Sequence, residues 1–189
     1  MGQLSLRELI LCALFVALVA VGALIRIPVG TDVFTLQFMF TLLAGLLLGP
    51  RLGATAVAVY ILLGLMGVPV FASGGGPGYI LQPTFGYLLG FVVQAWFCGW
   101  AARRGAVTFK RLLLINFGGM VIVYAFGLVW FYVISNYVID APVALYWVIL
   151  YCGILQIPPD ALLCVAAAAA AKRGLSAGIW LNPPRRTGR

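Results

Sequence analysis

The sequence predicts an all-α integral membrane protein, a bundle of six transmembrane helices. Of its 189 residues, 64% are hydrophobic and only 8% are charged, whereas about a quarter of the residues in soluble domains are charged. A helix needs about 20 apolar residues to cross a bilayer core, and apolar runs follow one another along the whole chain. We therefore expect residues 1–189 to form a single domain within the lipid bilayer.

Stretches rich in glycine, proline or basic residues separate the apolar runs and set the expected helix bounds. The six helices are expected at about 6–26, 36–49, 52–67, 80–102, 111–135 and 143–172. A glycine-rich loop over about 68–80 precedes the fourth helix, and a basic tail, 173–189, follows the sixth. The short connections between helices are typical of a compact bundle.

Basic residues predict the orientation of this bundle, because Lys and Arg accumulate on the cytoplasmic side of inserted helices. With six helices, every basic residue except Arg26 falls on the side that carries both termini. Both termini are therefore expected in the cytoplasm, and the glycine-rich loop is expected outside. The net charge of +8 then reflects membrane topology, and we expect no nucleic-acid partner.

Asp160 is the first candidate ligand-binding residue, because it lies deep in the last apolar run. An intramembrane carboxylate costs about 2.5–3.5 kcal/mol on insertion scales, so it normally faces the bundle interior and has a partner. Pro158 and Pro159 cannot donate backbone hydrogen bonds, and we expect a kink that leaves carbonyl groups for a ligand. Gln156, in the same segment, is a further candidate. The alternative is a structural carboxylate satisfied by a neighbouring helix.

A second polar group lies in the connection between the first two helices. Thr35 and Gln37 stand two residues apart in a segment expected to be extended or to begin a helix, where both side chains can point at a polar ligand. Ordinary helix capping by Thr35 explains the pattern equally well. Arg26, the one basic residue expected outside, either snorkels to the membrane interface or attracts an anionic solute.

The glycine-rich loop is expected to be the recognition loop. Gly74, Gly75 and Gly76 permit backbone conformations that side chains forbid, and such irregular backbone survives in a membrane only where protein or a watery cavity satisfies its polar groups. Polar tips on largely apolar side chains follow, which suits a small amphipathic ligand, at Tyr79, Gln82, Thr84 and Tyr87.

Gln82 and Thr84 stand where the fourth helix is expected to begin, and a helix N-terminus offers free N–H groups to a carbonyl or an anion. Capping of that helix is the plainer interpretation of the pair. On the first helix, Ala13 and Ala17 are small residues four apart, a spacing that allows another helix to approach closely. This pair either docks a partner protein or packs within the chain.

The residue inventory argues against catalysis. The sequence has no histidine, its four cysteines show no CxxC spacing, and it has four acidic residues in total. We therefore expect no enzyme activity, no metal and no cofactor. A channel or purely structural membrane protein, without a stoichiometric ligand, is the alternative from a different class.

In combination, these motifs resemble the BioY family, the biotin-binding substrate-specific (S) components of energy-coupling-factor (ECF) transporters. The resemblance spans the chain, and five fragments carry it in order, at 34–37, 43–53, 67–76, 83–87 and 158–160. It implies a six-helix bundle of the S-component type in a bacterial or archaeal cytoplasmic membrane, which captures biotin from outside. The partners implied are a transmembrane coupling protein (T component) and two cytoplasmic ATPases.

Family motifs also imply roles for particular residues. The family's AxxxA docking motif for the coupling protein matches Ala13 and Ala17, its binding aspartate matches Asp160, and its glycine-rich loop matches 74–79. The chain has no phosphate-binding loop, so ATP hydrolysis is expected on separate ATPase subunits.

Two positions depart from the family pattern. A lysine often lies three residues after the aspartate, where this chain has Leu163, and many members have Pro-Gly before the aspartate, where it has Pro158 and Pro159. Without that lysine, Asp160 is expected to be protonated, differently paired or tuned to a related ligand. Lipoate, a sulfur-ring compound with a carboxylate tail, is the competing ligand.

Biotin suits the expected site. Its ureido N–H groups fit acceptors such as Asp160 or Gln37, its ring sulfur and valeryl chain fit apolar walls, and its carboxylate fits backbone donors near Gly74 to Gly76. We expect the glycine-rich loop to close over bound ligand and to be mobile without it.

Overall fold

The protein is described here from a computed structural model that covers residues 5–29 and 32–181. This part of the chain is predominantly helical, as predicted, and contains in order α1 (Leu6–Leu24), β1 (Arg26–Val29), β2 (Asp32–Thr35), α2 (Gln37–Leu48), α3 (Pro50–Leu65), η1 (Pro77–Leu81), α4 (Phe85–Ala102), α5 (Phe109–Tyr137), α6 (Leu145–Cys152), η2 (Ile154–Gln156) and α7 (Ile157–Ser176). The elements η1 and η2 are short 3₁₀ helices, and β1 and β2 pair as an antiparallel hairpin.

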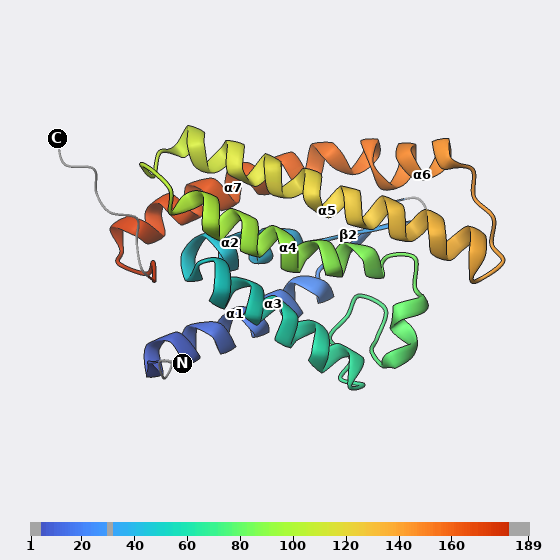
Figure 1. The fold of residues 1–189 in the computed structure, drawn as a ribbon, viewed down its shortest axis with the longest axis horizontal. Coiled ribbons are helices and arrows are strands. Elements are labelled where there is room, and N and C mark those ends of the chain that lie inside the picture. Colours follow the sequence, from blue (N-terminus) through green and yellow to red (C-terminus); the bar gives the residue numbers. More distant parts are fainter. Residues whose placement is uncertain (1–4, 30–31, 182–189) are drawn as a thin grey trace.

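Four helical segments are long and apolar enough to cross a membrane, which supports a membrane protein. They are α1, α4, α5 and the stretch Leu145–Gly174, which joins α6 to α7, while α2 and α3 are shorter apolar helices. The start of α1 and the end of α7 lie at the same end of the bundle, and the α3–α4 connection and α6 lie at the other (Figure 1). At the first end, Arg7 Nη2 donates a hydrogen bond of 2.6 Å to the Gly178 carbonyl oxygen.

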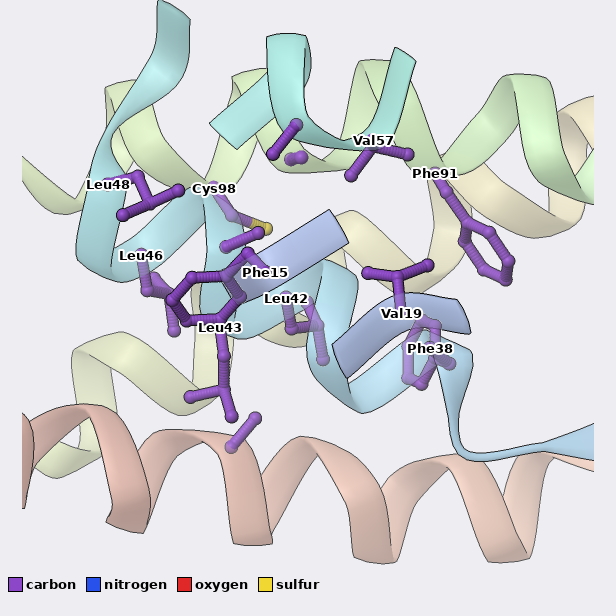
Figure 2. Packing of buried hydrophobic residues seen from close by; sticks show 14 of the residues in the cluster. Phe15, Val19, Phe38, Leu42, Leu43, Leu46, Leu48, Val57, Phe91 and Cys98 are labelled. Atoms are coloured by element: carbon purple, nitrogen blue, oxygen red, sulfur yellow. The ribbon is translucent and has the colours of Figure 1, made fainter. Parts of the chain in front are cut away.

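Local sequence signals explain where the first helix begins. Ser5 caps α1, because its Oγ accepts a hydrogen bond from the Glu8 N–H (3.3 Å) and Glu8 Oε2 accepts one from the Ser5 N–H (2.8 Å). Phe15 and Val19 then turn from α1 toward Leu42 and Phe38 of α2, within one buried apolar cluster (Figure 2). This core packs the helices of the bundle against one another.

Two expected helix bounds are wrong. The fourth helix begins at Phe85 and not near residue 80, because Gln82 precedes Pro83 and adopts an extended conformation (ψ 134°), as residues before proline tend to do. Residues 77–81 instead form η1, a separate 3₁₀ turn.

The sixth expected helix, 143–172, is also interrupted. It breaks at Gly153, so that α6 ends at Cys152, η2 follows, and α7 begins at Ile157. Pro158 and Pro159 fall in the first turn of α7, where their missing N–H groups cost no intrahelical hydrogen bond. The interruption therefore lies just before the prolines.

Arg103, directly after α4, anchors the segment that follows α7. Its guanidinium donates to the carbonyl oxygens of Leu46, Leu47 and Leu181, and burial lowers the pKa of Arg103 to about 10. The Leu181 N–H in turn donates to the Leu47 carbonyl oxygen at 2.9 Å. Together these groups satisfy carbonyls at the end of α2 that have no partner within the helix.

Candidate functional site

A cavity of about 280 Å³ is lined in part by the α3–α4 connection. This connection lies at the end of the bundle opposite the start of α1 (Figure 1). The walls of the cavity come from the hairpin, the start of α2, the α3–α4 connection, the first turns of α4, the later part of α5, and the η2–α7 junction. Eight of the predicted ligand-binding residues line it, namely Thr35, Gln37, Tyr79, Gln82, Thr84, Tyr87, Gln156 and Asp160.

Asp160 provides the only acidic side chain among the lining residues. It is 5% exposed, and its Oδ2 accepts a hydrogen bond of 2.7 Å from the hydroxyl of Tyr124 on α5. The carboxylate also stands in the first turn of α7, where the positive end of the helix dipole favours negative charge. The helix N-terminus and the tyrosine therefore hold an acceptor in an apolar setting. Tyr124 is a cavity residue that the sequence reasoning missed.

Gln156 places a hydrogen-bond donor in the same cavity. It is 7% exposed, and its Nε2 has no hydrogen-bond partner within the described part of the chain. An unsatisfied buried polar group costs about 1–3 kcal/mol, so the amide is poised for a ligand acceptor. Because η2 separates α6 from α7 just before Ile157, Gln156 reaches the cavity together with Asp160.

Thr35 and Gln37 form a hydrogen-bonded wall. Thr35 Oγ1 donates to Gln37 Oε1 at 3.1 Å, and Gln37 Nε2 donates to the hydroxyl of Tyr60 at 2.6 Å. The helix-capping alternative for Thr35 is wrong, because Leu36 is the N-cap of α2 and makes no side-chain cap hydrogen bond. At α4, Thr84 does occupy the N-cap position, yet its side chain makes no cap hydrogen bond there. Both hydroxyls instead border the cavity.

Aromatic side chains supply the apolar walls. Tyr79 in η1 is buried, and this burial raises the pKa of its hydroxyl, which stays protonated and able to donate. Tyr87 on α4 donates to the Cys152 carbonyl oxygen at 2.7 Å, which ties α4 to the break after α6. Phe91 and Phe131 complete the apolar lining.

The glycines of the loop do not line the cavity, contrary to their expected role as ligand contacts. Gly74 and Gly76 adopt positive φ angles of 111° and 110°, which L-residues with side chains rarely adopt, and the Gly76 N–H donates to the Gly64 carbonyl oxygen of α3 at 2.7 Å. They shape the loop against α3, and the loop residues that line the cavity are Ala72, Ser73 and Tyr79.

Arg26 closes the loop against the hairpin. Its guanidinium donates to the carbonyl oxygen of Ala72, which lines the cavity, so the exposed Arg26 side chain lies at the cavity rim. Leu163, which stands where the family often has lysine, packs against the apolar core and is not a lining residue. Asp160 is therefore part of the cavity lining, and Arg26 is a cation bonded to a lining residue at the rim.

Ala13 and Ala17 lie apart from this site. Both side chains are exposed on α1, while Phe15 and Val19 on the same helix are buried in the core. Packing of the two alanines within the described part of the chain, the alternative considered for them, is therefore not observed. They lie on an exposed face of α1 that also carries large apolar side chains.

The fold and the cavity define a helical membrane protein with a small-molecule pocket at one end of its bundle. The sequence profile of the BioY family matches residues 1–178, and the chain belongs to this family, which confirms the predicted resemblance. A probable biotin transporter of Lysinibacillus sphaericus is 42% identical over 90% of this chain and 88% of its own length. A biotin transporter of Thermotoga maritima is 43% identical over 71% of this chain and 78% of its own length.

A solved structure shares the fold. It is the crystal structure, at 2.1 Å, of the S-component for biotin from an ECF-type ABC transporter. The two chains align with a TM-score of 0.78 and 24% sequence identity, over 90% of this chain and 91% of the other. The bundle is therefore similar in fold to an ECF S-component.

Proposed function

We propose that this protein binds biotin as the substrate-binding S component of an ECF-type transporter. The observation that carries the proposal is the pairing, in one cavity of about 280 Å³, of a buried acceptor at Asp160 with the unpartnered donor of Gln156. A cyclic urea offers the complementary set, N–H donors beside a carbonyl acceptor. Small-molecule sites typically occupy about 300–1,000 Å³, so this cavity suits a ligand at the small end of that range.

The same pairing favours biotin over lipoate. The dithiolane ring of lipoate has no N–H group for Asp160 and no carbonyl for the Gln156 amide, so both would stay buried without a ligand partner. Phe91 and Phe131 offer apolar walls to a ring sulfur and an alkyl chain. Membership in a family whose relatives carry the name biotin transporter also supports this choice.

The ligand carboxylate is proposed to point toward the rim. Asp160 would repel it, whereas Arg26 donates to the carbonyl oxygen of Ala72 at the rim and the neighbouring Ser73 lines the cavity. This orientation replaces the expected contact with amides of Gly74 to Gly76. The loop over about 68–80 then acts as the lid of the site.

As a transporter subunit, the protein has a defined membrane topology and defined partners. The chain crosses the cytoplasmic membrane of a bacterium or archaeon with six helical segments, counting α6 to α7 as one, and both termini are cytoplasmic. The exposed Ala13 and Ala17 support docking of a T component on α1. ATP hydrolysis then belongs to two separate ATPase subunits, and this chain is not itself an enzyme.

Substitution of the carboxylate tests the proposal. Asp160→Asn keeps the size of the side chain but removes the charge, and hydrogen bonds to charged groups contribute about 1.5–3 kcal/mol, so biotin affinity should fall roughly 10- to 100-fold. The measurement is calorimetric titration of the purified protein with biotin and lipoate, preceded by mass spectrometry of any small molecule released from it.

The matched control is Asp140→Asn. Asp140 is exposed in the connection between α5 and α6 and has a φ of 50°, which asparagine also tolerates. The Asp140→Asn variant should bind biotin with the same affinity as the parent protein. Equal affinity of the parent and the Asp160→Asn variant would contradict the role of Asp160, and a parent protein that binds no biotin would contradict the function itself.

A further inference from the structure

The cavity wall is connected to the base of the loop through a tyrosine that does not line the cavity. Tyr60 lies on α3 and is fully buried, with 0% of its surface exposed. Its hydroxyl accepts a hydrogen bond from Gln37 Nε2 at 2.6 Å and donates one to the Val70 carbonyl oxygen at 3.0 Å. We propose that Tyr60 is a positioning residue, which orients the amide of Gln37 toward the ligand and couples it to the base of the loop.

The hydrogen bonds form one chain with a single direction. Thr35 Oγ1 donates to Gln37, the Gln37 amide donates to Tyr60, and Tyr60 donates to the backbone at Val70. Both ends of the Gln37 amide are thereby held, so its orientation is set by Tyr60 and Thr35 together. Thr35 and Gln37 line the cavity, and hydrogen bonds in such chains strengthen one another, so a ligand bonded to Thr35 strengthens the contact at Val70.

The base of the loop is a packed seat on α3, formed by Tyr60, Gly64 and Phe71. The Phe71 ring lies directly on Gly64, where any Cβ would overlap the ring. The Tyr60 ring meets Phe71 edge-on, with ring centroids 5.5 Å apart, and Phe71 lies 4.4 Å from the ring of Tyr79, which lines the cavity. Tyr60 thus contacts the loop twice, through its hydroxyl at Val70 and through its ring at Phe71.

This arrangement holds the loop at the seat, to which the Gly76 N–H bond to the Gly64 carbonyl oxygen also contributes. Backbone hydrogen bonds close the turn over Phe71, since Phe71 and Gly74 exchange N–H···O bonds of 2.9 and 3.2 Å. Tyr60 links the base of the loop to the binding wall, because it bonds to Gln37 of the wall and to Val70 of the loop. The inference rests on the proposed function for the identity of the ligand, but the contacts at Val70 and Phe71 exist without one.

Tyr60→Phe tests the inference, because it removes one oxygen atom and leaves the ring contact with Phe71. Gln37 Nε2 and the Val70 carbonyl oxygen then lose their partner. We expect faster hydrogen exchange of the 66–76 backbone without ligand, biotin affinity lower by about tenfold, and less slowing of that exchange at saturating biotin.

The matched control is Thr41→Val. Thr41 is also fully buried, its Oγ1 lies 2.9 Å from both the Phe38 carbonyl oxygen and Gln94 Oε1 and can donate to either, and it does not line the cavity. Both variants lose a buried hydroxyl and should therefore be less stable to heat. Only Tyr60→Phe should also change loop exchange and biotin affinity.

The assay is hydrogen exchange followed by mass spectrometry on the purified full chain, with and without saturating biotin, together with calorimetric titration. Loop exchange in ligand-free Tyr60→Phe equal to that of the parent, or to that of Thr41→Val, would overturn the inference. If the parent binds no biotin, the proposed function fails while the ligand-free comparison still decides the role of Tyr60. If Tyr60→Phe does not fold, Gly64→Ala displaces the Phe71 ring from the seat, and unchanged loop exchange in that variant overturns the inference.

Discussion

Replacement of Gln156 should raise the stability of the ligand-free protein and weaken its binding of biotin. Its buried Nε2 has no partner within the described residues, which costs the empty protein about 1–3 kcal/mol. Gln156→Met keeps an unbranched side chain of similar size and removes the unsatisfied donor. The ligand-free variant should therefore be more stable than the parent, and a change of 1 kcal/mol corresponds to about 2–4 °C in melting temperature for a chain of this length.

Biotin binding should change in the other direction. The methionine cannot donate to the ureido carbonyl, and the loss of one buried hydrogen bond should weaken binding about tenfold. A ligand at 100 times its Kd stabilises the folded state by about 2.7 kcal/mol, so excess biotin should raise the melting temperature of the parent more than that of Gln156→Met. Thermal unfolding with and without biotin, together with titration calorimetry, measures both effects.

Gln94→Met is the control for this pair of effects. Gln94 is also a buried glutamine whose Nε2 has no described partner, but it does not line the cavity, so biotin affinity should stay unchanged. A Gln156→Met variant that is less stable than the parent and still binds biotin equally well would refute both the unsatisfied donor and its role in recognition.

Two further predictions concern the rim and the outer face of α1. Arg26→Gln should weaken the binding of biotin more than that of biotin amide, because only the free acid has a charge to pair with the guanidinium near Ala72; titration with both ligands measures this, and an equal loss would place the carboxylate elsewhere. Ala13→Leu with Ala17→Leu should leave biotin affinity unchanged, because both residues are exposed and distant from the cavity, but should reduce co-purification with a T component. Undiminished co-purification would count against docking at this face.

Much of the candidate site follows from the residues themselves. A carboxylate within an apolar run needs compensation, which predicts a site at Asp160, and the polar residues near the glycine-rich loop predict Tyr79 and Tyr87. The same reasoning applies to Tyr60 and Tyr124, since a tyrosine within an apolar helix generally needs a partner for its hydroxyl. The sequence shows that these tyrosines lie in apolar helices, but it does not show which group each hydroxyl bonds to.

The sequence by itself determined that this chain is helical and membrane-embedded, because apolar composition and run length decide those properties without reference to any contact. It also determined family membership, through motifs in a particular order. Composition, run length and motif order can all be read along the chain without knowledge of contacts between distant residues.

The tertiary structure alone decided which side chains share the cavity. Helices buried in lipid are apolar all round, so periodicity does not reveal the inward face, and Tyr124 meets Asp160 across 36 residues of sequence. It also showed that Gly74, Gly75 and Gly76 do not line the cavity, while the Gly76 N–H bonds to the Gly64 carbonyl oxygen of α3. A glycine-rich sequence reveals conformational freedom, but the direction in which that backbone faces depends on what packs beneath it.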